Sequence, residues 1–232
     1  MRPLTLNIPV YNEEEILAPN IGKLIDHADR LNTEYEILVV SNGSTDQSDA
    51  IGRELEKKYP RVRYFSLPKK GVGRAFRLAA KEARFDHLIS LDIDLTTDLS
   101  FVKEANQLLE NNVMVIGSKI AGSQKRSWAR KLGSGIYIYF TQLFFRLSIH
   151  DFSIGAKGYQ RGFVLENISW VDDHTSYVLN LAFLADRNKK KIVEIPVECV
   201  DRRASRFNLF AEAIYRFYML FRLALSASRK AK

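Results

Sequence analysis

The most informative stretch of this sequence is His87-Leu88-Ile89-Ser90-Leu91-Asp92-Ile93-Asp94, in which an apolar run ends in two carboxylates. The run predicts a buried strand, and Asp92 and Asp94 lie where that strand leaves its sheet. Because alternate residues of an extended chain point the same way, both carboxylates can face one point. Carboxylates that close repel each other, and a hard divalent cation such as Mg²⁺ or Mn²⁺ removes the conflict. The stretch therefore indicates a metal site suited to a diphosphate, although a strand that simply ends in a polar loop has the same pattern.

Strands and helices are predicted to alternate on both sides of this stretch. Strands are expected at residues 4–10, 37–40, 62–66, 88–91 and 113–116, with helices beginning near residues 13, 47 and 72. Continuous apolar strands joined by helical crossovers indicate a parallel α/β sheet, whose ligands bind at the carboxyl ends of the strands. The polar motifs found so far follow such ends: Asn12-Glu13-Glu14, Asn42-Gly43-Ser44 and Asp92-Ile93-Asp94.

The pattern changes after residue 117. Basic residues cluster between residues 119 and 131, and an aromatic segment follows at 136–147. Further elements are predicted at 156–160 (strand or hairpin), 176–186 (helix), 191–197 (strand) and 207–225 (helix). We expect one domain with a C-terminal extension.

The bulk composition is that of an ordinary globular protein. Of the 232 residues, 46% are hydrophobic and 27% are charged, which excludes a disordered chain. The net charge of +8 suggests an anionic partner: a nucleotide, a phospholipid surface or a nucleic acid. The single cysteine, Cys199, excludes an intrachain disulfide and fits a reducing compartment. No stretch approaches the ~18 uninterrupted apolar residues of a spanning helix, so any membrane association is expected to be peripheral.

Two features have competing interpretations. Gly71-Val72-Gly73 opens a helix and could bind phosphate there, but it lacks the third glycine of a dinucleotide motif, and a plain turn fits equally well. In the last helix, Phe217 and Phe221 recur at the spacing of a core-facing surface. Basic residues flank that helix, however, and aromatic residues with cationic flanks also fit a helix that lies in a membrane interface.

Several motifs occur in a fixed order. They are Ile8-Pro9-Val10-Tyr11-Asn12-Glu13-Glu14, Val39-Val40-Ser41-Asn42-Gly43-Ser44-Thr45-Asp46, Gly71-Val72-Gly73-Arg74-Ala75 and Asp92-Ile93-Asp94. This series resembles the family 2 glycosyltransferases of GT-A fold. Later motifs resemble the polyprenyl-phosphate branch of that family, which includes dolichol-phosphate mannose synthase and dolichyl-phosphate β-glucosyltransferase. These are Gly117-Ser118-Lys119, Trp128-Ala129-Arg130, Asp151 with Gly155 and Lys157, and Asp201-Arg202-Arg203 with Ser205-Arg206.

The resemblance implies an α/β fold of GT-A type, a mostly parallel sheet flanked by helices, with a C-terminal amphipathic interface helix. The catalytic domain would span residues 1–206, with a nucleotide-binding half at about 1–117 and an acceptor half at 118–206. Residues 207–232 would form the membrane-interface helix and a basic tail.

The resemblance also implies roles for individual residues. The donor nucleotide sugar would be bound by Pro9, Tyr11, Glu13, Ser41, Asn42, Arg74, Asp92 and Lys119. Asp92 and Asp94 would hold Mg²⁺ or Mn²⁺. The catalytic residues would be Asp94, Asp151 and Arg130. The acceptor phosphate would be bound by Arg130, Arg203, Ser205 and Arg206.

The implied reaction is the inverting transfer of glucose or mannose from a UDP- or GDP-linked sugar to a polyprenyl phosphate, at the cytoplasmic face of a membrane. Metal and cations would stabilise the charge that develops on the departing diphosphate. The acceptor phosphate is already an anion, so a strong general base is not required. In-line attack would convert an α-linked donor into a β-linked product.

Departures from the family pattern leave alternatives open. Ser41 and Asn42 stand where relatives often carry two aspartates, which leaves the base undetermined, and Thr96 replaces a glutamine that is frequent in mannose synthases. A soluble transferase acting on a glycan or glycolipid would use Asp151 as its base. A catalytically inactive, membrane-bound interaction module is the third hypothesis. Nucleic-acid binding is the least expected function, because no recognised reading motif is present.

Overall fold

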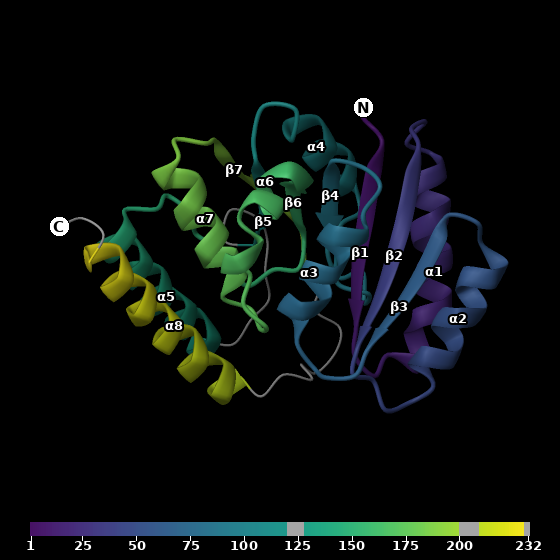
Figure 1. Ribbon diagram of the computed structural model, residues 1–232, viewed down its shortest axis with the longest axis horizontal. Coiled ribbons are helices and arrows are strands. Elements are labelled where there is room, and N and C mark those ends of the chain that lie inside the picture. The colour runs from purple at the N-terminus through teal and green to yellow at the C-terminus, as the bar shows by residue number, and fades with distance from the viewer. Residues whose placement is uncertain (120–127, 200–208, 230–232) are drawn as a thin grey trace.

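One continuous sheet of seven strands lies at the centre of the described residues, 1–119, 128–199 and 209–229 of this computed structural model (Figure 1). The strands are β1 (Leu4–Val10), β2 (Tyr35–Asn42), β3 (Val62–Leu67), β4 (His87–Ser90), β5 (Met114–Ser118), β6 (Lys157–Gln160) and β7 (Ile192–Pro196). Their order across the sheet is β3-β2-β1-β4-β6-β5-β7. All neighbours are parallel except β6, which runs antiparallel to both β4 and β5.

Helices cover the sheet, which explains the continuous apolar strands. Every residue of β2 is buried, and Leu6 at the middle of β1 pairs with Ile37 and Ile89 on its two sides. The helices packed around the sheet are α1 (Glu14–Asp29), α2 (Ser48–Lys58), α3 (Val72–Glu82), α4 (Ser100–Leu108), α6 (Arg161–Glu166) and α7 (Tyr177–Arg187), with the 3₁₀ helix η1 (Ile168–Trp170). Burial of both sheet faces is the arrangement expected of parallel strands with helical crossovers.

Two further helices form a separate pair at one end of the molecule. α5 (Trp128–Phe145) and α8 (Leu209–Arg229) lie side by side, at the end opposite α1 and α2 (Figure 1). Aromatic rings join them, because Phe140 contacts both Phe217 and Phe221, with ring centroids 6.1 and 5.8 Å apart. In the described part of the chain, none of the helices combines the length and apolar character needed to cross a bilayer.

A carboxylate of the loop after β2 fixes the carboxyl ends of β1 and β2 relative to each other. Asp46 accepts hydrogen bonds from the backbone N–H of Glu14, at the start of α1, and of Ser48, at the start of α2, at 3.2 and 3.0 Å. A carboxylate is favourable at both positions, because the helix dipoles place partial positive charge there. The loops that follow both strands are therefore held together at this edge.

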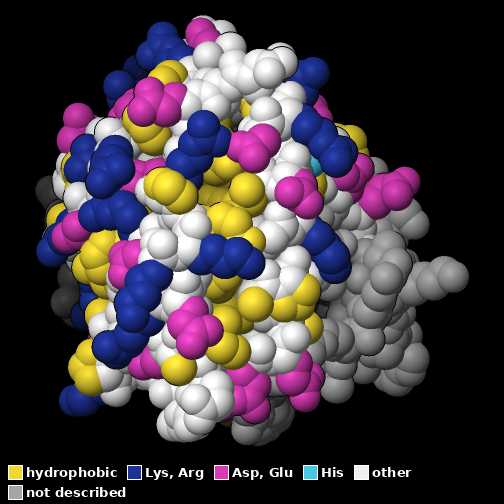
Figure 2. All heavy atoms as spheres, turned by 90° about the vertical axis from the view of Figure 1, so that its right-hand side faces the viewer, with side chains coloured by type: hydrophobic (Ala, Val, Ile, Leu, Met, Phe, Trp, Pro, Cys, Tyr) yellow, Lys and Arg dark blue, Asp and Glu magenta, His cyan; other side chains and the backbone are white. Residues whose placement is uncertain are grey.

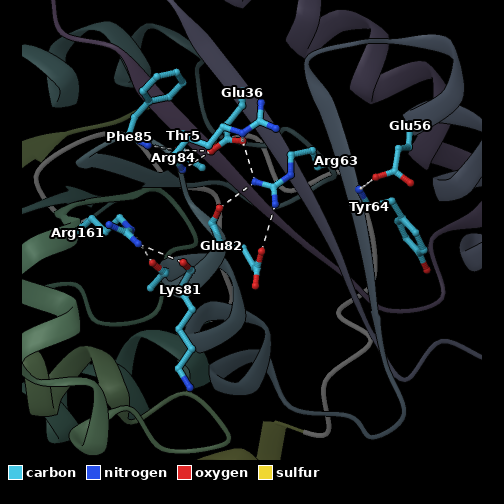
Figure 3. A network of polar contacts seen from close by, with 11 residues as sticks. Thr5, Glu36, Glu56, Arg63, Tyr64, Lys81, Glu82, Arg84, Phe85 and Arg161 are labelled. Carbon is cyan, nitrogen blue, oxygen red and sulfur yellow. Dashed lines mark hydrogen bonds and ion pairs between the residues drawn. The ribbon is translucent and has the colours of Figure 1, made fainter.

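At the opposite edge, a buried glutamate joins the amino ends of the strands (Figure 3). Glu36 is 2% exposed and accepts hydrogen bonds from the Thr5 hydroxyl (2.9 Å), the Arg84 backbone N–H (2.6 Å) and the Arg63 guanidinium (3.1 Å). Arg63 also pairs with Glu82 at the end of α3. Because the buried charge is paired and hydrogen-bonded, its desolvation cost is compensated.

Charge is distributed evenly over the face that carries α2 and β3. Lysine and arginine side chains alternate there with aspartate and glutamate, with apolar side chains between them (Figure 2). A nucleic-acid surface needs clustered positive charge. This face of the described residues shows no such cluster.

The predicted fold class is confirmed, and each strand predicted between residues 4 and 197 is present within one or two residues of its expected bounds. The expected helix at 207–225 is observed as α8, and residues 207 and 208 lie outside the described part. Helix α4 and the antiparallel insertion of β6 were not predicted. The sheet continues across residue 117, where the sequence suggested a division into two halves.

Candidate active site

The residues predicted to bind a metal and a diphosphate lie along one edge of the sheet. Asp92 follows β4 by two residues and Lys119 directly follows β5. Because β6 is antiparallel, its first residue, Lys157, lies at this same edge, opposite Ser90 of β4. Strands from both halves of the sequence therefore contribute charged side chains to one place.

The backbone around Asp92 and Asp94 is held in a tight turn. The Asn20 side chain of α1 donates to the carbonyl of Ile93 at 2.9 Å, and the Thr96 N–H donates to the Asp94 carboxylate at 3.1 Å. A Cβ atom at Gly155 would lie 2.2 Å from the Asp92 carboxyl carbon, so any side chain at residue 155 would displace this carboxylate. The position of Asp92 is thus set by a neighbouring loop as well as by β4.

Asp92 keeps solvent-exposed surface, although many protein atoms lie around its carboxylate. Desolvation by these protein atoms raises the pKa of Asp92, and the negative charge of Asp94 raises it further. Lys157, Lys119 and a backbone hydrogen bond from Gly155 oppose the rise. An effect of this sign is the one expected between two neighbouring carboxylates.

These two carboxylates fit a Mg²⁺ or Mn²⁺ ion that is shared with a substrate. Among the described residues, no group of three or more His, Cys, Asp or Glu side chains could enclose an ion. Mg²⁺ is typically held by one or two carboxylates, with phosphate oxygens and water completing its shell. The site therefore has the donor set for an ion that binds together with a diphosphate, but not for a metal enclosed by protein alone.

Asp151 is fixed by many hydrogen bonds. Its carboxylate accepts from the backbone N–H groups of Lys119 (3.1 Å), Ser153 (2.9 Å) and Ile154 (3.2 Å), and from the Ser153 hydroxyl (2.8 Å). Burial acts to raise the pKa of Asp151, but the charges of Lys119 and Lys157 and the Ser153 hydrogen bonds outweigh it and lower that pKa. A carboxylate held in this way is a weak base, which favours a positioning role.

Lys157 provides the matching positive charge. Its side chain is buried, donates to the Ile154 carbonyl, and lies near both Asp151 and Asp92. Burial lowers the pKa of Lys157 to about 8, and the two carboxylates counteract this effect. The charge of Lys157 therefore favours the ionised forms of both Asp92 and the buried Asp151.

Five of the predicted nucleotide-binding residues lie at or just after the carboxyl ends of β1 and β2: Pro9, Tyr11, Glu13, Ser41 and Asn42. The Lys70 ammonium lies 3.7 Å from the ring centroid of Tyr11, and the Asn12 side chain accepts from the Thr45 N–H at 2.7 Å. Pro9 and Glu13 are half-buried on either side of this loop. The structure thus brings Pro9, Tyr11 and Glu13 to one part of the edge.

Ser41 and Asn42, which stand in place of two aspartates, are buried and hydrogen-bonded within the protein. The Ser41 hydroxyl donates to Asp49 at 2.6 Å. The Asn42 amide donates to the Val10 carbonyl at 2.8 Å, and its oxygen accepts from the Gly71 N–H at 3.2 Å. Both side chains stabilise the ends of β1 and β2, and their predicted contact with the donor remains a prediction.

The amino end of α3 is packed against the loop before α7. The Gly73 N–H donates to the Asp173 carbonyl at 3.1 Å, and a Cβ at Gly73 would lie 2.0 Å from the Asp172 carbonyl oxygen. Arg74, predicted to bind the donor, forms an ion pair with Asp173. The glycines thus allow close backbone packing here, and the structure places a protein loop where the sequence left a phosphate site open.

That same loop contacts α8. Tyr215 donates its hydroxyl proton to Asp172 at 2.6 Å, and the Arg216 Nε donates to the Thr175 hydroxyl at 3.2 Å. Sequence reasoning missed these residues, because Asp172 and Asp173 look like a solvated loop and Arg216 like one of many basic residues on an amphipathic helix.

Four predicted residues cannot be placed in the site. Arg130 belongs to α5, but its side chain lies outside the described residues. Arg203, Ser205 and Arg206 also lie outside them. The binding of acceptor phosphate by these four residues therefore remains a prediction.

Comparison with protein families agrees with the geometry. The model of the family described as "Glycosyl transferase family 2" matches residues 5–167. The chain belongs to this family. The matched region contains all of the charged groups around Asp92 and Asp94 except those from the loop before α7 and from α8.

The names of two curated relatives of this glycosyl transferase family 2 protein contain a polyprenyl phosphate. Dolichyl-phosphate beta-glucosyltransferase ALG5C of Trichomonas vaginalis is 26% identical over 219 residues, which cover 84% of this chain and 63% of the relative. Undecaprenyl-phosphate 4-deoxy-4-formamido-L-arabinose transferase of Edwardsiella ictaluri is 26% identical over 198 residues, covering 84% of this chain and 59% of the relative. The chain thus spans about three fifths of the length of these two relatives.

Solved structures show the same fold. Glucosyl-3-phosphoglycerate synthase from Mycobacterium tuberculosis in complex with UDP has a TM-score of 0.65 at 18% identity, covering 96% of this chain and 80% of that one. The same enzyme with Mn²⁺, UDP-glucose and phosphoglyceric acid has a TM-score of 0.65 at 16% identity, with the same coverage. At this identity the likeness concerns the fold alone.

Proposed function

We propose that this protein transfers a hexose from a UDP- or GDP-linked sugar to a polyprenyl phosphate at the cytoplasmic face of a membrane. Asp92 and Asp94 would hold Mg²⁺ or Mn²⁺ on the diphosphate, and the ion would stabilise the charge of this leaving group. Lys119 and Lys157 add positive charge at the same edge. The names of the two relatives support a polyprenyl phosphate acceptor, and that of the first supports glucose as the sugar. The Mn²⁺ and UDP-glucose in the structural neighbour support the metal and the type of donor.

One observation carries the proposal: a pair of helices suited to lipid is hydrogen-bonded to the loop that packs on the start of α3. The outer surface of α5 and α8 exposes Tyr139 and Tyr218, each 61% exposed, and further large apolar side chains. The inner side of α8 is hydrogen-bonded through Tyr215 and Arg216 to the loop before α7. We propose that a lipid chain on the outer surface directs its phosphate past this loop toward the carboxyl edge of the sheet.

The geometry of Asp151 favours a phosphate acceptor over a neutral sugar hydroxyl. A hydroxyl must lose a proton as it attacks, and Asp151 was the candidate base for that alternative. Its hydrogen bonds and lowered pKa make it a poor proton acceptor. A polyprenyl phosphate needs no such base, and its in-line attack on an α-linked donor gives a β-linked product.

The experiment that tests this function is a transfer assay with Asp94→Asn. With a UDP- or GDP-sugar, Mn²⁺ and a short polyprenyl phosphate, we expect turnover to fall by more than about a hundredfold, because the ion loses a charged ligand. The circular dichroism spectrum and melting temperature should match those of the wild type. The matched control is Asp98→Asn, an exposed residue of the following turn. Wild-type turnover in Asp94→Asn would refute the metal role, and wild-type protein inactive with every donor would refute the proposed reaction.

A further inference from the structure

Helix α8 has two faces of opposite character. Ile214, Tyr218 and Leu225 are 56%, 61% and 65% exposed on the outer face, whereas Leu220 and Leu223 are buried against the protein. Tyr215 and Arg216 lie on the inner side near the beginning of the helix, where they contact residues 172–175. A cationic side chain is therefore directed inward from a helix whose outer face is apolar.

The contacts of the neighbouring residues fix where Arg216 lies. The ring of His174 packs edge-on against the ring of Tyr215, with centroids 4.8 Å apart, while the Tyr215 hydroxyl bonds Asp172. Asp173, the next residue of the loop, binds Arg74 and Arg77 of α3. The beginning of α8 is thus connected through one loop to α3, so the Arg216 side chain has a defined position beside the loop that covers the start of α3.

The loop that Arg216 contacts lies at the carboxyl edge of the sheet. A Cβ at Gly71 would lie 2.6 Å from the Asp173 carbonyl oxygen, and the Gly71 N–H donates to the Asn42 side chain at the end of β2. The charge of Arg216 contributes to lowering the pKa of Lys157, the residue that lies beside Asp92 and Asp151, after the larger effect of burial. It also acts on Tyr177, whose pKa is raised by burial and by the Asp92 charge. Arg216, Lys157 and Lys119 therefore act on one region, which they approach from α8, β6 and β5 respectively.

We infer that Arg216 binds the phosphate group of the lipid acceptor and that its hydrogen bond to Thr175 orients the guanidinium for this task. The inference rests on the proposed function and adds a residue on α8 to the acceptor-binding group. A guanidinium has five N–H donors in a planar fork, so it binds phosphate oxygens while it also donates to a hydroxyl. Because Arg216 reaches inward from the lipid-facing helix, it meets the acceptor phosphate, whereas Asp92, Asp94 and Lys119 hold the donor from the sheet.

The test uses Arg216→Gln, Arg216→Lys, Thr175→Val and, as a matched control, Arg222→Gln, which changes an exposed arginine of the same helix. Calorimetry would measure binding of a short, water-soluble prenyl phosphate, and separately of UDP and GDP with Mn²⁺.

We expect Arg216→Gln to weaken prenyl phosphate binding by roughly tenfold or more, the usual effect of losing a charge-assisted hydrogen bond. Thr175→Val should weaken it less, and Arg222→Gln should change it by less than about twofold. Nucleotide binding should be unchanged in all four variants.

Three outcomes would overturn the inference: unchanged prenyl phosphate binding in Arg216→Gln, an equal loss in Arg222→Gln, or a loss of nucleotide binding alone. If Arg216→Gln fails to fold, Arg216→Lys and Thr175→Val decide, because unchanged binding in both would overturn the inference as well. The proposed function can fail separately. Wild-type protein that binds prenyl phosphate through Arg216 but transfers no sugar would refute the reaction and leave the inference standing.

Discussion

Gly155 and Asp92 approach each other so closely that the glycine helps to place the carboxylate. The Gly155 backbone contributes a hydrogen bond to Asp92, and any side chain at residue 155 would occupy the space of the Asp92 carboxylate.

Gly155→Ala should therefore impair activity without unfolding the protein. The added methyl group would push Asp92 away from its place beside Asp94, and a displacement of about 1 Å at a reacting centre costs roughly a hundredfold in rate. Transfer activity and thermal melting would be measured side by side. Gly22→Ala in α1 is the matched control, because nothing lies within 4 Å of a Cβ there. Equal activity in both variants would contradict the role of Gly155.

At this scale, the sequence predicted the residues whose position follows from local geometry. Asp92 and Asp94 come directly after an apolar strand, so their shared direction could be predicted. The pairing of Arg74 with Asp173 could not, because it depends on which loop packs onto α3. The same holds for Lys157, which reaches Asp92 only because β6 lies next to β4.

At the scale of elements, the loop before α7 is connected to α3 mainly through Asp173. Hydrogen bonds from Arg74 and Arg77 hold the pKa of Asp173 well below the ordinary carboxyl value of 3.8. A lowered pKa in the folded state stabilises the fold above the ordinary value, and that contribution is lost as the pH falls below it. The ion pairs are partly exposed, so solvent screening keeps the contribution small.

Asp173→Asn should lower the free energy of unfolding by about 1 kcal/mol at pH 7. It should also make stability less dependent on pH below about 4, because the charge that titrates there is gone. Urea unfolding at pH 7 and pH 3 measures both effects. Asp186→Asn, which changes an exposed aspartate of α7, serves as the control. An unchanged pH dependence in Asp173→Asn would show that these ion pairs do not stabilise the loop.

The network around Glu36 predicts a larger effect, because this carboxylate is buried (Figure 3). Glu36→Gln keeps the size of the side chain but leaves Arg63 without its buried partner, and breaking such a pair typically costs about 3 kcal/mol. The loss would appear as a lower urea midpoint with an unchanged slope. Glu56→Gln is the matched control: Glu56 is exposed and accepts a single bond from the Tyr64 N–H. A loss below about 1 kcal/mol in Glu36→Gln would contradict this account.

At the scale of the whole molecule, exposed apolar side chains are concentrated at one end. Of the nine large hydrophobic residues that are exposed in the described part of the chain, eight belong to α5 and α8. A contiguous exposed apolar surface marks an interaction site, and aromatic side chains suit the interface between water and lipid. The orientation of the whole protein on a membrane would follow from this surface.

The double variant Tyr139→Ser/Tyr218→Ser should therefore bind vesicles more weakly. Removing two exposed rings deletes apolar area that would enter the lipid, and we expect a loss of binding of about tenfold. Flotation with vesicles that contain anionic phospholipid would measure it. Tyr59→Ser at the end of α2 is the control, because it lies at the other end of the molecule (Figure 1). Equal flotation of all three proteins would remove the basis for a membrane-bound orientation.

The topology was the least predictable part of the fold. Hydrophobic patterns identified most of the strands, because the pattern reflects the burial of each strand by itself. They did not give the order of strands in the sheet, since pairing depends on contacts between segments far apart in sequence. β6 is only four residues long and pairs with β4 and β5 through such contacts alone.

The place of β6 has a consequence for how the chain is made. In the finished sheet, β5 lies between β6 and β7. Both of these neighbours follow β5 in the sequence, so the ribosome releases β5 before either strand with which it pairs. The apolar segment Met114–Ser118 must therefore wait, unpaired, until residues 157–160 leave the exit tunnel. Nascent segments of this kind are prone to aggregate and are natural clients of chaperones. Asp92, Lys119 and Lys157 therefore cannot come together before β6 has been synthesised and has paired with β4 and β5.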